Sequence, residues 1–157
     1  MSLRRIPRRD WLLAAAGLAL TVPRAARAAE LPLAHNLKEE LAAALAKRQP
    51  LVVMVSLEGC PFCKVARDHY LAPLHRDENL PVVQVDMRSR SAVRDFRGHQ
   101  LTHDDLVRRW KIRIAPTVLF FGHGGVEVAE RLVGGYIPDF YGAYLDQRLE
   151  QARARLR

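Results

Sequence analysis

The sequence is organised around the stretch Leu51–Lys64, which reads LVVMVSLEGCPFCK. Its apolar, β-branched start predicts a buried strand, and the Gly-Cys-Pro-Phe-Cys turn that follows leads into a helix. The spacing of Cys60 and Cys63 places their thiols about one helical turn apart, close enough to form a disulfide. Cys60 precedes the first turn, where free backbone N–H groups and the helix dipole stabilise a thiolate, and Pro61 suits the first helical position. We therefore expect Cys60 to be the nucleophile and the more buried Cys63 to be the resolving thiol.

These two cysteines are the only ones in the 157-residue chain. A bridge between residues so close in sequence closes too small a loop to stabilise the fold substantially. The pair therefore indicates redox chemistry rather than a structural disulfide.

Residues 1–28 have the pattern of an export signal peptide: an arginine-rich start, an apolar segment from Trp11 to Val22, and a small-x-small cleavage site at Ala26–Ala28. The apolar segment is too short to span a bilayer as a stable helix. Arg8-Arg9 resembles the twin-arginine signature, so the twin-arginine and general secretory routes both stay open. We expect cleavage to leave residues 29–157 as one domain in the periplasm, with an uncleaved inner-membrane anchor as the alternative.

The formal net charge of +8 is unevenly divided along the chain. Residues 1–28 hold six arginines and one acid, Asp10, which accounts for +5 and leaves +3 for the remainder. Because the excess lies mostly in the leader and in an arginine-rich C-terminus, the basic composition does not indicate nucleic-acid binding.

Helices and strands alternate along the rest of the chain. Helices are predicted at 36–48, 64–70, 103–110 and 139–153, and strands at 51–55, 81–87, 117–121 and 126–133, the last two strands forming a hairpin. A polar loop with at most a short helical turn is expected at 88–101. This order predicts an α/β fold with a central mixed β-sheet and helices on both faces.

Three finer expectations accompany these elements. Asn36 is expected to cap the first helix with Glu39 as its reciprocal partner, and Thr102 is expected to cap the third with Asp105. Pro73 is expected to end or kink the helix that follows the cysteines. One side of the last helix is expected to be apolar, with Phe140, Tyr144, Leu145 and Leu149 on it.

Three segments together resemble the thioredoxin superfamily, over residues 36–152. They are Glu58–Lys64 with its two cysteines, Trp110–Phe121 with an Ala-Pro-Thr strand start, and Val133–Tyr136 with a glycine pair. The resemblance implies a thioredoxin fold and thiol–disulfide oxidoreductase activity. The export signal and the long insertion at 88–101 make periplasmic thioredoxin-like proteins, including the kind encoded with sulfur-oxidation systems (SoxW-like), the nearest group.

The resemblance also implies a substrate-binding surface opposite the cysteines. Pro116 is expected to follow a cis peptide bond there, a costly arrangement kept for a reason, with a plain trans proline at a strand start as the alternative. Ala115 is expected to offer backbone hydrogen bonds to an extended substrate, and the proline to keep metal ions away from the thiols. Pro61 and Phe62 lie between the cysteines, and Phe62 is expected to face outward and contact a partner.

Two positions depart from cytosolic thioredoxin. Met54 stands where thioredoxin has a buried aspartate, and Gly59 stands where it has a tryptophan. Without that aspartate, deprotonation of Cys63 needs water or Glu58. Glu58 is equally consistent with a solvated surface residue, so the proton acceptor stays open.

Taken with the leader, these residues favour a periplasmic thiol–disulfide oxidoreductase. They favour a reductant of protein disulfides over a disulfide-forming oxidant. The expected partners are protein or small thiol and disulfide substrates and a membrane-linked electron donor. The chain is expected to be a monomer. No cofactor beyond the Cys60–Cys63 disulfide is expected, and no metal site.

Other interpretations of the cysteine pair stay open. A disulfide-forming oxidant uses the same two thiols in the reverse direction. A Cys-x-x-Cys pair also binds soft metals, so a non-enzymatic module that handles Cu(I) or haem thiols is an alternative, as is a redox-inert relic of the fold. A zinc site needs about two more ligands, and His69 and His75 better suit solvated or hydrogen-bonded roles.

Overall fold

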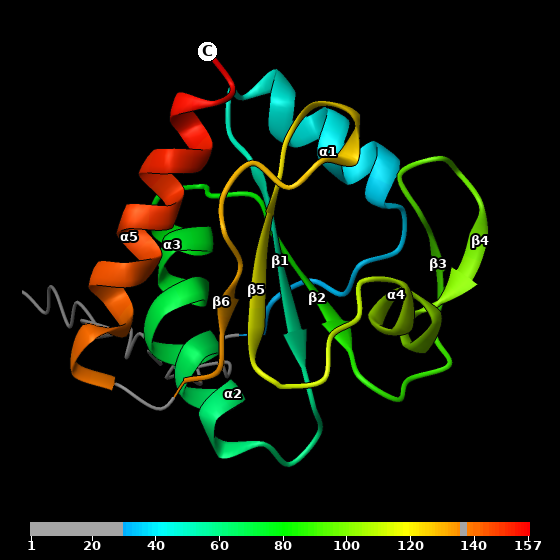
Figure 1. Cartoon of the computed structure of the whole chain (residues 1–157), viewed down its shortest axis with the longest axis horizontal. Coiled ribbons are helices and arrows are strands. Elements are labelled where there is room, and N and C mark those ends of the chain that lie inside the picture. Colours follow the sequence, from blue (N-terminus) through cyan, green and yellow to red (C-terminus); the bar gives the residue numbers. More distant parts are fainter. Residues whose placement is uncertain (1–29, 136–137) are drawn as a thin grey trace, which may run out of the picture.

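The central sheet has four strands in the order β2-β1-β5-β6 (Figure 1). They are β1 (Leu51–Ser56), β2 (Val82–Asp86), β5 (Thr117–Phe121) and β6 (Leu132–Val133). β1 pairs in parallel with β2 and antiparallel with β5, so the sheet is mixed, as predicted. All six residues of β1 are buried, as its continuous apolar run predicts for a central strand covered on both faces.

The structure, a computed structural model, describes residues 30–135 and 138–157. The expected export signal at 1–28 and Tyr136 of the third motif lie outside the described residues. None of the helices in the described part of the chain is long and apolar enough to span a bilayer.

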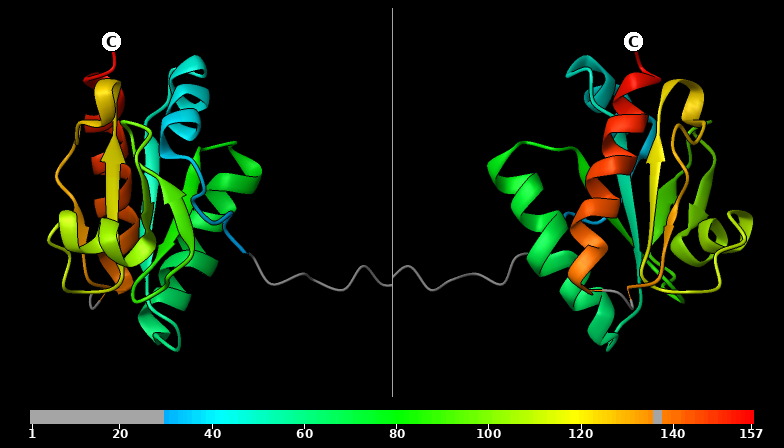
Figure 2. Two further views of the ribbon diagram at one scale, coloured as in Figure 1. Left: turned by 90° about the vertical axis from the view of Figure 1, so that its right-hand side faces the viewer. Right: turned by 60° about the vertical axis from the view of Figure 1, so that its left-hand side comes forward.

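Helices cover both faces of the sheet, as predicted (Figure 2). Alternate side chains of β1 separate the two layers: Val53 and Val55 pack with one set of helices, and Val52 and Met54 with the other. The first set is α1 (Leu37–Ala46) and α4 (His103–Arg109). The second set is α2 (Pro61–Val65), the π-helical segment η1 (Ala66–Leu71), α3 (Ala72–Asp77) and α5 (Pro138–Ala154).

The helix after the cysteines is continuous through Pro73. α2, η1 and α3 follow one another without a break from Pro61 to Asp77. Proline removes one backbone donor from a helix, and the six-residue π-helical segment that directly precedes α3 accommodates the change of hydrogen-bond pattern. Pro73 therefore alters the helix without ending it.

The helix caps follow the predictions except for one partner. The Asn36 side chain accepts a hydrogen bond from the Glu39 backbone, and Thr102 and Asp105 form a reciprocal capping box. The reciprocal carboxylate of α1 is Glu40, not Glu39: its Oε1 accepts from the backbone N–H groups of His35 (2.8 Å) and Asn36 (3.1 Å). The side chain one position further along reaches back to two donors at once, which explains the difference.

The predicted loop at 88–101 contains a two-stranded antiparallel hairpin, so that prediction was wrong. Its strands are β3 (Ala92–Arg94) and β4 (Gln100–Thr102). Asp95 makes the turn by accepting hydrogen bonds from the backbone N–H groups of Arg97 (2.9 Å) and His99 (2.8 Å). Val93 is buried between two exposed neighbours, a strand pattern too short to stand out in a polar segment.

The predicted strand at 126–133 was also too long. β6 contains only Leu132–Val133, and Glu127 makes an isolated bridge to Phe121. An ion pair between Glu127 and Arg131 closes a bend between these two contacts, and Arg131 also donates to the carbonyl of Trp110 at 2.9 Å. Backbone hydrogen bonds still join Val128 to Phe120 and Gly122 to Val126, so the Arg131 contacts interrupt the pairing only between Val128 and β6.

The buried face of α5 differs from the predicted one. Tyr141, Leu145 and Leu149 are buried at a spacing of four, with Ala152 continuing the stripe. Phe140 and Tyr144 are 59% and 45% exposed, because each lies one position round the helix from that stripe.

Tyr141→Phe is expected to raise the free energy of unfolding by about 1 kcal/mol. The Tyr141 hydroxyl is buried without a hydrogen-bond partner among the described residues, and burial raises its pKa. The substitution keeps the ring contact with Tyr70, whose centroid lies 5.0 Å away, and removes the desolvated hydroxyl. Urea denaturation measures the change, with Tyr144→Phe as the exposed control, expected to stay within about 0.5 kcal/mol. A loss of stability in Tyr141→Phe alone would show that the hydroxyl has a partner.

Candidate active site

Four strand ends meet at one edge of the sheet, the lower edge in Figure 1. β1 and β2 end there at Ser56 and Asp86, β6 ends there at Val133, and the antiparallel β5 begins there at Thr117. The loops 57–60, 87–91 and 112–116 therefore converge on this edge. Two of these loops carry the cysteine motif and the Ala-Pro-Thr segment.

Cys60 and Cys63 form a disulfide at the start of α2, with their Cα atoms 5.3 Å apart. Cys60 is the N-cap residue, and its Sγ accepts a hydrogen bond of 3.1 Å from the backbone N–H of Cys63. Cys60 is partly exposed, whereas Cys63 is 1% exposed. In the reduced protein, the N–H donor and the positive end of the helix stabilise a thiolate at Cys60.

The peptide bond between Ala115 and Pro116 is cis, as expected from the resemblance. The carbonyl oxygen of Ala115 lies 3.8 Å from Cys60 Sγ. Thr117 Oγ1 donates a hydrogen bond of 2.7 Å to the carbonyl of Ile114, which holds the loop closed at the start of β5. Backbone polar groups of this loop therefore lie next to the exposed sulfur.

Exposed apolar side chains belong to the same two segments. Phe62 is 51% exposed, as predicted, and Ile114 is 49% exposed. Gly135 packs against both segments, because a Cβ at that position would lie 3.4 Å from Pro116 Cγ and 3.5 Å from Phe62 Cβ. The glycine pair of the third motif thus reaches the site, and a larger side chain at 135 would crowd the proline and Phe62.

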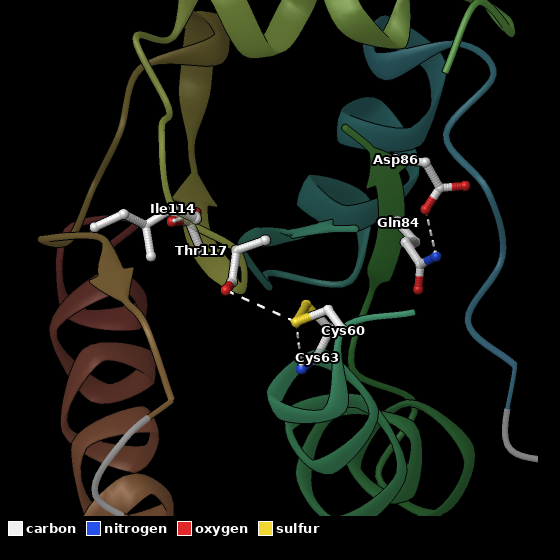
Figure 3. The surroundings of a disulfide bond; sticks show 7 residues. Cys60, Cys63, Gln84, Asp86, Ile114 and Thr117 are labelled. Carbon is white, nitrogen blue, oxygen red and sulfur yellow. Dashed lines mark hydrogen bonds between the residues drawn. A yellow bond between two sulfur atoms is a disulfide. The ribbon is translucent and has the colours of Figure 1, made fainter. Parts of the chain in front are cut away.

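A groove of about 1040 Å³ opens on the β2 side of the disulfide. Gln84 and Asp86 of β2 lie across the disulfide from Ile114 and Thr117 (Figure 3), and they line this groove together with both cysteines. Gln84 Nε2 donates a hydrogen bond of 2.7 Å to Asp86 Oδ1, while Gln84 Oε1 is buried without a partner among the described residues. Neither residue was predicted from the sequence. The signal was their alternation with valines in a strand that ends at the same edge.

The acidic residues that line the groove are Glu58 and Asp86. Glu58 is exposed, on the loop before the cysteines. Met54 is fully buried in the apolar cluster that contains Cys63. The position where thioredoxin has an aspartate is therefore apolar in this chain, as its sequence indicates.

A buried histidine fixes the end of β2. His103 is 1% exposed, and its Nδ1 accepts a hydrogen bond of 3.0 Å from the backbone N–H of Asp86. Its Nε2 lies 2.9 Å from the carbonyl of Ala34 and donates to it, so the proton is on Nε2. The imidazole ties α4 and the N-terminal segment to the strand that forms one wall of the groove.

His103→Leu is expected to lower the free energy of unfolding by about 2–3 kcal/mol, because the Asp86 N–H and the Ala34 carbonyl both lose a buried partner. Urea denaturation measures the loss. The exposed His69 provides the control, since His69→Leu is expected to change stability by less than about 0.5 kcal/mol. Equal effects of the two substitutions would mean that water replaces the imidazole of His103.

The two histidines considered as metal ligands have other surroundings. His75 Nδ1 is hydrogen-bonded to the carbonyl of Leu80 at 2.8 Å, and His69 is exposed. Within residues 30–135 and 138–157, no three His, Cys, Asp or Glu side chains are grouped as metal ligands.

The model of the thioredoxin-like domain family matches residues 37–150. No curated protein sequence matches the chain significantly. Among solved structures, a DsbH oxidoreductase is 19% identical with a TM-score of 0.52, over 89% of this chain and 94% of that one. A poplar thioredoxin h is 18% identical with a TM-score of 0.50, over 73% and 95%. The periplasmic thioredoxin SoxS of Paracoccus pantotrophus is 23% identical with a TM-score of 0.44, over 66% and 99%.

The structural likenesses agree with the thioredoxin fold predicted from the sequence, and the SoxW-like grouping stays a prediction. The family match covers most of the chain and includes the cysteine pair and the cis-proline loop. Proteins of this family act on protein or thiol substrates. The chain therefore belongs to the thioredoxin-like domain family, and its Cys60–Cys63 pair makes it a thiol–disulfide oxidoreductase.

Proposed function

We propose that this oxidoreductase works in the periplasm and reduces disulfides of other proteins. The observation that best supports thiol–disulfide exchange at this site is the asymmetry of the cysteine pair. Cys60 is partly exposed at the N-cap beside the Ala115 carbonyl, whereas Cys63 is 1% exposed. A substrate can therefore reach one sulfur, and the other can act only on the first.

In the reduced protein, the Cys60 thiolate attacks one sulfur of a substrate disulfide. A mixed disulfide forms, and the second substrate sulfur leaves as a thiolate. Cys63, once deprotonated, attacks Cys60 Sγ, so that the Cys60–Cys63 bond forms and the mixed disulfide breaks. Two electrons pass from the pair to the substrate, and the two thiol protons end on the substrate thiols. The bridged pair in this structure corresponds to the oxidised end of the cycle.

The substrate binds, in this proposal, as an extended segment along the cis-proline loop. The backbone of Ala115 offers hydrogen bonds to it, in the manner of an added strand. Pro61 and Phe62, both exposed, provide apolar contact to the substrate, while the buried Pro116 fixes the loop on the other side of the reacting sulfur.

The proton of Cys63 leaves through the groove on the β2 side, either to Glu58 or to water. Both cysteines and Glu58 line that groove, and the buried Met54 offers no acceptor. The pH dependence of the resolving step distinguishes the two routes. A Glu58→Gln variant slows this step if the carboxylate accepts the proton, and leaves it unchanged if water does.

The proposed location rests on the leader, and the location determines what a reductant needs. Residues 1–28 have the pattern of a signal for export to the periplasm, where the oxidising environment returns thiols to disulfides. A reductant there needs a donor that restores the dithiol, and we assign that role to a membrane-linked reductase. The proposed cycle uses the cysteine pair without a further cofactor.

The reduction potential of the purified protein tests the direction. A reductant is expected below about −200 mV, towards the thioredoxin range, whereas a value near about −120 mV would identify a disulfide-forming oxidant. Insulin-disulfide reduction and faster alkylation of Cys60 than of Cys63 near neutral pH test the assigned roles. Recovery of the protein from the periplasmic fraction, and its loss when residues 1–28 are removed, tests the location.

A further inference from the structure

The edge of the sheet that carries the disulfide also concentrates positive charge. The segments 57–64, 87–91 and 112–116 contain four basic residues and one acid, Glu58. Their net charge of +3 equals that of residues 29–157, which hold nineteen Lys and Arg against sixteen Asp and Glu. The remainder of that region is thus neutral overall. The four basic residues are Lys64, Arg88, Arg90 and Arg113, and all are exposed.

Three of these four cations, the arginines, have no ion-pair partner among the described residues. Lys64 forms an ion pair with Asp68, but Arg88, Arg90 and Arg113 make no ion pair within the described part of the chain. Asp86 lines the same groove as Arg88 and keeps its negative charge, because its hydrogen-bond partner is the neutral Gln84 amide. Asp104 and Asp105 at the start of α4 pair with Arg108. The three arginines without an ion pair still outnumber the two acids of this edge, Glu58 and Asp86.

The exposed arginines belong to two loops that converge on the edge with the reactive sulfur. Arg88 lines the β2-side groove together with Cys60 and Cys63. Arg113 lies two residues before Ala115, whose carbonyl is 3.8 Å from Cys60 Sγ. Asp86, directly before the first loop, and Ile114 of the second lie on opposite sides of the disulfide (Figure 3), so each loop carries an exposed arginine on its own side of a segment that crosses Cys60.

We infer that the partner of this site is a protein segment with acidic residues on both sides of its reactive cysteine. This inference rests on the proposed function and specifies its substrate class. Positive charges on both sides of the nucleophile attract such a segment and disfavour a basic one. The exposed apolar surface of Phe62 and Ile114 and the free backbone near Ala115 favour a polypeptide over an anionic lipid surface.

Three disulfide-containing peptides of equal length test the inference, with Asp, Ser or Lys at the positions that flank the reactive cysteine. At low ionic strength, kcat/KM for reduction is expected to be about tenfold higher for the acidic than for the basic peptide. The ratio is expected to approach one near 1 M salt, where the screening length is about 3 Å. Equal rates for the three peptides at low salt would overturn the inference and leave the proposed reductant function intact. Reduction of none of them would overturn both.

Charge-reversing substitutions test whether Arg88 and Arg113 cause the preference for the acidic peptide. Arg88→Glu with Arg113→Glu is expected to reverse the preference, so that the basic peptide reacts faster. The matched control, Lys47→Glu with Arg155→Glu, makes the same change in net charge at exposed positions away from the cysteine loops, and is expected to retain the preference for the acidic peptide. Equal effects of the two pairs would overturn the inference in favour of net charge alone. Binding to vesicles with anionic lipid, without discrimination among the peptides, would overturn it in favour of a membrane surface.

Discussion

Cys60→Ser is expected to lower kcat/KM for disulfide reduction by about 10³-fold or more, because a serine hydroxyl is not ionised near neutral pH and cannot replace a thiolate nucleophile. The fold is expected to remain. The Cys60 side chain acts as N-cap of α2, and serine is a favourable N-cap residue that accepts the same hydrogen bond from the N–H of position 63. Circular dichroism and urea denaturation of the reduced proteins check that the loss is chemical rather than structural.

Cys63→Ser is the matched variant, and its expected result is different. Cys60 still attacks the substrate, but nothing resolves the intermediate, so a covalent mixed disulfide accumulates and is seen as an added mass that reductant removes. The double variant, with both cysteines replaced, is expected to trap nothing. Accumulation in Cys60→Ser instead of Cys63→Ser would mean that the roles are reversed, and would contradict the burial of Cys63 at 1% exposure.

The parts of the fold that were predicted correctly depend on local sequence. β1 is a continuous apolar run, and the caps at Asn36 and Thr102 need only a partner within four residues. The order of helices and strands then restricts the architecture to a mixed sheet covered on both faces. The cis bond before Pro116 followed only from the resemblance, because nothing in an Ala-Pro pair alone selects that isomer.

The errors arose where distant side chains decide the structure. The bend before β6 depends on Arg131, which pairs with Glu127 and reaches the carbonyl of Trp110 across the fold. The β3–β4 hairpin was missed for a different reason: the hydrogen bonds of its turn at Asp95 are local, but its strands have three residues each, too few to show an alternating pattern in a polar segment. In α5, the choice between two adjacent apolar stripes depends on the residues of the sheet and of η1 that the helix packs against, which the helix sequence does not contain.

The candidate site likewise has one part that local sequence predicted and one part that it did not. Its cysteine side is one strand-to-helix turn, so spacing and helix geometry predicted the exposed and the buried sulfur. The β2 wall comes from residues more than twenty positions later, and its shape depends on His103 holding the backbone of Asp86. Gln84, Asp86 and the flanking arginines became part of the site only when the register of β1 and β2 was known.

Met54→Asp is expected to lower the free energy of unfolding by about 3–5 kcal/mol at neutral pH. It introduces at this position the carboxylate that thioredoxin carries there. Met54 is fully buried with Cys63, Leu71 and Val118, and this apolar cluster offers an ionised carboxylate no partner. Met54→Leu keeps the volume and the apolar character and is expected to cost less than about 1.5 kcal/mol.

The pH dependence distinguishes a buried charge from simple loss of packing. Burial raises the pKa of an introduced aspartate in the folded state above its unfolded value near about 3.9, because desolvation disfavours the charged form. The penalty is therefore full above the folded-state pKa and decreases as the pH falls through it, since the folded state then holds a proton that the unfolded state still releases. Urea denaturation at pH 7 and pH 5 is expected to show a smaller difference between Met54→Asp and Met54→Leu at the lower pH. A pH-independent difference would mean that the aspartate is hydrated in the folded state and that water reaches the region beneath Cys63.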